Sequence, residues 1–131
     1  VINANSFYTA GNTTLAILNG TTTMKLRGVG IDPVMDMQGN FSTTAFDPVE
    51  LQIMYAGEGL IKLRGSNELA ATIYAPNAHV DMASGYDVYG SILAGNYTNS
   101  GGATVHYDTA LASKYFMISN PFMSTFTWKK Y

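Results

Sequence analysis

The sequence contains no cysteine, which excludes a disulfide framework and a cysteine-ligated zinc site. Charged residues make up 12%, about half of the usual share, and the formal net charge is −2. No cluster of lysine and arginine occurs, so the charge attraction that drives nucleic-acid binding is missing. No apolar run approaches the roughly 20 residues that cross a bilayer, and we therefore expect no direct membrane span.

Hydrophobic residues nevertheless make up 47% of the 131 residues, which is enough for a packed core. Asparagine, threonine, serine, glycine and tyrosine supply most of the polarity. A surface solvated by hydroxyl and amide groups is common in secreted and cell-surface β proteins. We therefore treat residues 1–131 as a single domain. The absence of cysteine leaves the compartment open, because both a reducing cytosol and an extracellular setting permit it.

A short repeat dominates the middle of the chain. Five pairs of residues lie 19 positions apart: Leu69 and Val88, Ala71 and Gly90, Ile73 and Ile92, Ala75 and Ala94, and Asn77 and Asn96. The tetrapeptide Lys-Leu-Arg-Gly also occurs twice, at 25–28 and 62–65, which is about two such intervals. An interval of about 18 to 19 residues suits one coil of a β-solenoid. The repeat therefore predicts an all-β, right-handed β-solenoid in which Ile73 and Ile92 stack.

Alternation of apolar and polar residues, with many β-branched and aromatic side chains, predicts strands along nearly the whole chain. We expect them at residues 13–18, 22–26, 34–37, 51–55, 60–63, 69–75, 79–82, 86–93, 104–107 and 122–128. Glycine and asparagine stand between these segments, where tight turns favour them. The one helix that we expect is short and lies near residues 109–116.

The segment 51–111 carries a more specific pattern. It holds Leu-Gln-Ile-Met-Tyr at 51–55, Tyr-Ala-Pro-Asn-Ala at 74–78, a Tyr-Gly step at 89–90 and His-Tyr-Asp at 106–108. This pattern resembles the β-helical C-terminal domain family of bacterial PilX-like, type IV pilus-associated cell-surface proteins. Its structural motif here consists of Tyr74, Pro76, Asn77, Gly90, His106, Tyr107 and Asp108. The resemblance implies a surface-associated role linked to pilus-like systems, and it carries over no catalytic residue. The chain departs from the family in lacking a membrane-spanning pilin helix.

One strand of this motif can be oriented from the alternation alone. Ile73 and Tyr74 point to opposite sides of the strand, so that one packs inside the solenoid and the other faces out. We expect Pro76 to end that strand and Asn77 to turn the corner.

Residues with catalytic or metal-binding chemistry are few. His79 and His106 are the only histidines, and no His-x-His pair supports a metal site. A glycosidase needs two nearby carboxylates, but Asp81 and Asp87 flank one turn as solvated turn residues do. No serine lies in a Gly-x-Ser-x-Gly elbow. We therefore expect no enzyme activity, no cofactor and no metal.

Tyrosines recur along the predicted coils. Tyr86, Tyr89, Tyr97 and Tyr107 would fall on successive turns of the solenoid. One interpretation places their rings in the core and at its edge. The other makes them an exposed ligand face, because exposed tyrosine favours interfaces and a row of rings can bind sugars.

Both terminal segments, 1–8 and 117–131, have the pattern of strands that need a partner. Ile2 and Ala4 alternate with polar residues in the first, and Phe122, Phe126 and Trp128 share one face of the second. A solenoid exposes strand edges at both ends and must cap them or stack on them. Each terminal segment would therefore cap its own coil or make a subunit contact.

These features predict a non-enzymatic extracellular structural protein, a subunit or accessory component of a pilus-like cell-surface filament. Its partners would be copies of itself or pilin-like proteins, joined through strand edges and termini. The alternative is a monomeric adhesin or carbohydrate-binding module that holds a glycan on its tyrosine face. Asn12, Asn19, Asn40 and Asn96 stand in Asn-x-Ser/Thr sequences, which accept glycans only where exported proteins are glycosylated.

Overall fold

The computed structural model describes residues 1–11, 13–43 and 45–112. Within these residues the chain forms eleven strands and one helical turn at 110–112. The strands are β1 (Ile2–Ala4), β2 (Phe7–Thr9), β3 (Thr14–Ile17), β4 (Thr22–Leu26), β5 (Met35–Met37), β6 (Asn40–Thr43), β7 (Leu51–Tyr55), β8 (Leu60–Arg64), β9 (Glu68–Ala83), β10 (Asp87–Ser100) and β11 (Thr104–Tyr107). All pairings between them are parallel.

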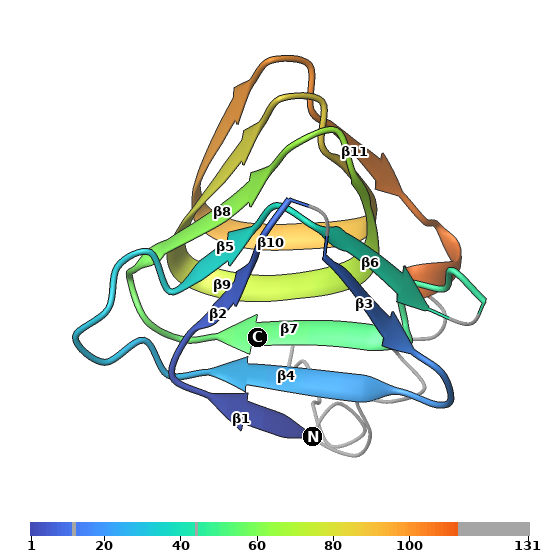
Figure 1. Cartoon of the computed structure of the whole chain (residues 1–131), viewed down its shortest axis with the longest axis horizontal. Coiled ribbons are helices and arrows are strands. Elements are labelled where there is room, and N and C mark those ends of the chain that lie inside the picture. The colour runs from blue at the N-terminus through green and yellow to red at the C-terminus, as the bar shows by residue number, and fades with distance from the viewer. Residues whose placement is uncertain (12, 44, 113–131) are drawn as a thin grey trace, which may run out of the picture.

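The chain winds as a right-handed triangular coil with three faces (Figure 1). The first face consists of β1, β4, β7 and residues 72–75 and 91–94. The second consists of β2, β5, β8 and residues 79–83 and 96–100. The third consists of β3, β6, residues 68–71 and 87–90, and β11. Five coils therefore lie one on another, which confirms the predicted β-solenoid.

One inward-facing column shows the register of the coils. Ile2, Met24, Ile53, Ile73 and Ile92 are partners on successive strands of the first face. The predicted stacking of Ile73 and Ile92 is thus confirmed. The longest step along this column runs from Met24 to Ile53, and only the later steps, through Ile73 to Ile92, come close to the predicted spacing.

The predicted equivalence of Asn77 and Asn96 is wrong. A bulge between Ala94 and Asn96 shifts the register, and Asn96 pairs with His79 instead. The bulge lies where the chain turns from the first face to the second. A corner can therefore absorb extra residues without disturbing the strands on either side of it.

The two Lys-Leu-Arg-Gly segments are not equivalent either. Lys25 belongs to β4 on the first face, whereas Lys62 belongs to β8 on the second face. Their separation is one coil plus one face rather than two coils. The difference arises because the second coil carries long corners at residues 27–34 and near residues 45–50.

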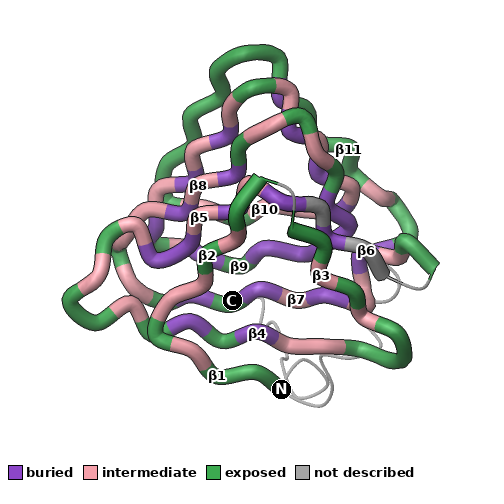
Figure 2. Tube along the Cα trace, in the orientation of Figure 1, coloured by how far each residue is buried: buried purple, intermediate pink, exposed green. Residues whose placement is uncertain are grey.

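Side chains from all three faces fill the triangular interior. Figure 2 marks the buried residues along the strands of these faces. The largest fully buried ones are Tyr86, Met24, Met35, Met37, Leu51, Ile53, Ile61, Leu63, Leu69, Ile73, Met82 and Val34. Burial stabilises each by roughly 1.5–3 kcal/mol relative to exposure. The predicted orientation of the motif strand is confirmed, because Ile73 is buried and Tyr74 is exposed.

Asparagine side chains hold the corners by bonding to the backbone of the adjacent coil. Asn77 Nδ2 donates to the carbonyl oxygen of Ala56 at 2.9 Å. Asn67 Nδ2 donates in the same way to the carbonyl oxygen of Gln38. The predicted corner at Asn77 is therefore present, although Pro76 bends β9 there without ending it.

The structure has strands that the sequence patterns did not predict. These are β2, β6 and the second half of β10, residues 96–100. The last reads Asn-Tyr-Thr-Asn-Ser, which lacks apolar alternation and resembles a turn. Segment 1–8 likewise holds two strands, β1 and β2, rather than one. The strand predicted at 122–128 lies outside the described residues, and of the predicted helix the described part covers 110–112.

No helix in the described ranges is long and apolar enough to cross a membrane.

Candidate functional site

Among the described strands, those at the two ends of the solenoid each have one edge with no paired strand. At the first coil, β1 and β2 pair only with β4 and β5 among the described strands. At the fifth coil, residues 91–94 and 96–100 pair only with the fourth coil, and β11 pairs only with β10, within the part of the chain that the structure describes. Such an edge is a template for another parallel strand.

Interior side chains also become more accessible at these ends. The apolar residues that pack on the core while staying partly exposed are Ala4, Phe7, Leu15, Ile17, Ile92 and Ala94, and all belong to the first or the fifth coil. Ile2 is exposed although its column partner Met24 is fully buried. The predicted contact residues Ile2 and Ala4 thus lie at an open end. Phe122, Phe126 and Trp128 lie outside the described residues.

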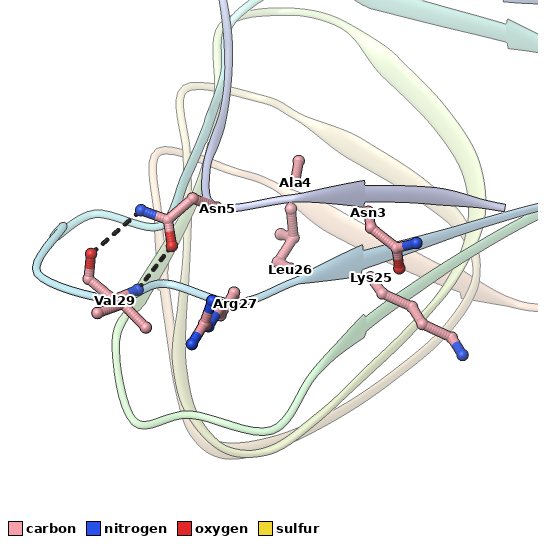
Figure 3. A pocket seen from close by; sticks show the side chains of 7 residues that line it. All are labelled: Asn3, Ala4, Asn5, Lys25, Leu26, Arg27 and Val29. Atoms are coloured by element: carbon pink, nitrogen blue, oxygen red, sulfur yellow. Dashed lines mark hydrogen bonds between the residues drawn. The ribbon is translucent and has the colours of Figure 1, made fainter.

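A hollow crosses the first two coils beside the first face (Figure 3). It is lined by Asn3, Ala4, Asn5, Lys25, Leu26, Arg27 and Val29. The Val29 N–H donates to Asn5 Oδ1 at 2.9 Å, and Asn5 Nδ2 donates to the Val29 carbonyl oxygen at 3.1 Å. Asn5 therefore ties the corner of the first coil to the long corner of the second.

The prediction that the four tyrosines form one exposed ligand-binding surface is wrong. Tyr86 lies in the core with 0% exposure. Tyr97 belongs to the second face, whereas Tyr89 and Tyr107 belong to the third. The Tyr97 hydroxyl reaches inward and donates to Met82 Sδ at 3.4 Å. The tyrosines do not form one surface because only Tyr89 and Tyr107 share a face, while Tyr86 is buried and Tyr97 lies on another face.

An aromatic cluster does lie on the third face, and it is formed by Phe46, Tyr89 and His106. The Tyr89 and His106 rings stack with centroids 4.3 Å apart, on paired strands of the fourth and fifth coils. Phe46 meets Tyr89 edge to face at 5.2 Å. His106 Nε2 also lies 3.6 Å from Asp87 Oδ1. These contacts join neighbouring coils to the corner loop and indicate a stabilising role.

Among the described tyrosines, Tyr86 is the one that is fully buried. Burial raises the pKa of its phenol. Its hydroxyl oxygen has no hydrogen-bond partner among the described residues. A buried hydroxyl without a partner costs about 1–3 kcal/mol. The residue therefore stabilises the fold through its ring and weakens it through its hydroxyl.

We expect Tyr86→Phe to leave the free energy of unfolding unchanged or to raise it by about 1 kcal/mol. An unfolded phenol ionises near pH 10 while the buried one resists ionisation, so the stability that Tyr86 contributes is complete below about pH 10 and declines above it. Urea unfolding between about pH 8 and 11 should show a smaller alkaline loss for Tyr86→Phe than for the natural chain. The exposed variant Tyr107→Phe should keep that loss, and equal alkaline losses in all three proteins would contradict the prediction.

The histidines and the paired carboxylates do not converge. His79 Nε2 lies 2.6 Å from Thr98 Oγ1 on the second face, whereas His106 belongs to the third. Asp81 and Asp87 also lie on different faces. Within residues 1–11, 13–43 and 45–112, no group of three or more histidine, aspartate and glutamate side chains could hold a metal ion.

The outer side of the second face carries a column of alternating charge that the sequence analysis missed. Asp36, Lys62 and Asp81 are register partners on successive coils. Arg64 joins this column through a two-pronged bond to Asp36, with Nε–Oδ1 at 2.8 Å and Nη2–Oδ2 at 2.5 Å. Like charges never stand directly opposite each other in this column, which favours the observed register.

The outer side of the first face carries an apolar stripe, also missed. Met54, Tyr74 and Leu93 are register partners on the third, fourth and fifth coils. Their side chains are 38%, 45% and 50% exposed. The stripe follows the repeat spacing, since Tyr74 and Leu93 stand 19 positions apart as Ile73 and Ile92 do.

The remaining motif residues have structural positions. Gly90 adopts a φ of +144° and is the register partner of Ala71 on the third coil. Asp108 follows β11, and its Oδ1 accepts a hydrogen bond from the Ala110 N–H at 2.9 Å. Asp108 thus begins the helical turn at 110–112, as a capping residue does.

Comparison with known proteins gives a family for this chain. No curated protein and no solved structure matches it significantly. One family model matches residues 4–114, which include parts of all five coils and most of the chain. The chain therefore belongs to the family described as a domain of unknown function (DUF7305).

Proposed function

We propose that this chain is a non-enzymatic structural domain of an extracellular, pilus-like cell-surface filament, which joins copies of itself or pilin-like partners through the edges of its end coils. The observation that carries the proposal is the pair of parallel edges that no other described strand covers, one at β1 and β2 and the other on the fifth coil. Both edges belong to the same triangular register, so one can continue the other.

The parallel pairing favours head-to-tail stacking. When the first coil of one copy follows the fifth coil of another, every strand keeps its direction and its face. Such a contact is heterologous and leaves a free edge at each end of the pair, so it extends into a filament rather than closing. It would also bury Ile2 and Leu15 of one copy against Ile92 and Val105 of the other, all of which are partly or largely exposed.

The outer faces support a scaffold role. Their polar side chains pair with neighbouring coils, as in Asp36 with Arg64, His79 with Thr98, and Asp87 with His106. These contacts run along the solenoid axis and hold the coils in register. A filament subunit needs this axial stiffness, because load passes from coil to coil.

We expect the purified chain to form fibres visible by negative-stain electron microscopy, with a mass that rises with concentration in light scattering. The double variant Ile2→Lys, Leu15→Lys places two ammonium groups at the inward-facing positions of the first coil. Lysines at the inward-facing positions of an edge strand block the stacking of coils, because their charge would have to be buried in the apolar contact. This variant should stay monomeric.

The matched control is Asn3→Lys, Ala16→Lys, which adds the same charge to the same strands on their exposed outer side. It should still form fibres. A natural chain that remains monomeric at high concentration, alone and with pilin-like partners, contradicts the proposal. Equal loss of assembly in both double variants contradicts the role of the first-coil edge.

A further inference from the structure

The apolar stripe of Met54, Tyr74 and Leu93 has an apolar hollow beside it at the fifth coil. The hollow is lined by Thr72, Ile73, Tyr74, Ser91, Ile92, Leu93, Tyr107, Leu111 and Ala112. A second hollow on the other side of Tyr74 is lined by Lys25, Leu26, Met54, Tyr55, Ala56 and Tyr74. The outer side of the first face is therefore grooved along the stripe, and its floor is mostly apolar.

The chain itself leads to this groove. After β11, Asp108 begins the helical turn at 110–112, which brings Leu111 and Ala112 to the wall of the first hollow. Leu111 is only 3% exposed, so the chain is already anchored at the groove where the described part ends. The segment 113–131 follows.

The composition of this segment matches the groove. Its large apolar and aromatic side chains are Tyr115, Phe116, Met117, Ile118, Phe122, Met123, Phe126, Trp128 and Tyr131. Its charged residues are three lysines, and no acidic residue occurs. An extended segment of this length reaches about 60 Å. The stripe from Leu93 to Met54 spans only two strand spacings, about 10 Å, so the segment is long enough to cover it.

We propose that residues 113–131 of the same chain dock along the apolar stripe of the first face, over Leu93, Tyr74 and Met54. The segment straps the third, fourth and fifth coils together across their outer side. It covers side chains that would otherwise remain an exposed apolar patch. Leu93 belongs to the edge strand of the fifth coil, but its side chain lies on the outer side, whereas the proposed stacking uses the strand edge and the inward-facing Ile92. The docking and the stacking can therefore be tested separately.

The single tryptophan of the chain, Trp128, lies in this segment and reports on docking. In the full-length protein we expect its emission maximum to lie to the blue of that of the urea-unfolded chain, and acrylamide to quench it severalfold less. Leu93→Asp places a carboxylate at the fifth-coil end of the stripe, in the lining of the first hollow. It should move both the emission and the quenching of Trp128 toward the values of the unfolded chain.

Val29→Asp is the matched control, because Val29 is an exposed apolar residue outside the groove. It should leave Trp128 unchanged, and far-ultraviolet circular dichroism should show that both variants keep the strands. As a second measurement, trypsin should cut after Lys114 much faster in Leu93→Asp than in the natural chain.

Two results would overturn the proposal. One is that acrylamide quenches Trp128 in the natural chain as readily as in urea, or that neither Leu93→Asp nor Tyr74→Asp changes the emission and quenching of Trp128. The other is protection of Trp128 that disappears on dilution, which would show that a second copy covers the segment. Either result leaves the fibre test of the end coils untouched, so the two proposals can fail separately.

Discussion

Replacing Gly90 by alanine is expected to destabilise the fold by more than about 3 kcal/mol. The added Cβ would overlap the carbonyl oxygen of Ala71 on the adjacent strand, and it would lie 2.9 Å from Pro48 Cβ. Because one obstacle is backbone and the other a rigid ring, neither can move aside cheaply. The midpoint of urea unfolding, followed by circular dichroism, measures the effect.

Gly102 provides the matched control for this prediction. It also has a positive φ, +82°, but an added Cβ would meet nothing within 4 Å. Gly102→Ala should therefore cost only about 1–2 kcal/mol, the strain of a left-handed backbone. Equal losses for the two variants would mean that backbone conformation, and not the close approach of two coils, makes Gly90 necessary.

Truncating the middle of the inward column should have the second large effect. Ile53 is 1% exposed and lies between Met24 and Ile73, so Ile53→Ala leaves a cavity with packed coils on both sides. We expect a loss of about 2–5 kcal/mol in the free energy of unfolding. The same change at Ile92, on the partly exposed fifth coil, should cost less.

Gln52→Ala is the control on the same strand. Gln52 points outward from β7 and is only partly buried, so its truncation should change stability by no more than about 0.5 kcal/mol. A loss of unfolding free energy for Ile92→Ala as large as that for Ile53→Ala would contradict the predicted order of the two effects. It would show that the fifth coil is buried as deeply as the third.

The later coils could be predicted well from the sequence because their corners are short and regular. Strands β7 and β11 begin and end at the predicted residues, and Ile73 stacks on Ile92 as the repeat predicts. In the second coil β4 also begins and ends as predicted, but the spacing to the third coil could not be predicted, since the inward column makes its longest step between Met24 and Ile53. Extra residues at a corner leave the strands intact, but they change the number of residues between equivalent positions, so that no fixed period can be found in the sequence.

Which residues share an outer surface depends even more on the lengths of the corners. The tyrosines recur along the chain, but Tyr86 is buried while Tyr89 and Tyr97 stand on different faces. Conversely, no single segment reveals the apolar stripe of the first face, because Met54 and Tyr74 are separated in the sequence by every corner of one coil. Each face is formed by strands from successive coils and not by any one segment of the sequence.

The sequence by itself determined the class of fold, because period-two alternation that recurs after one short interval can bury its apolar side only by stacking parallel coils. It also determined which side of a strand enters the core, as Ile73 and Tyr74 show. Only the tertiary structure decided which residues share an outer face and which edges stay open. Those relations depend on how many residues each corner absorbs, and corner length leaves no trace in the alternation of the strands.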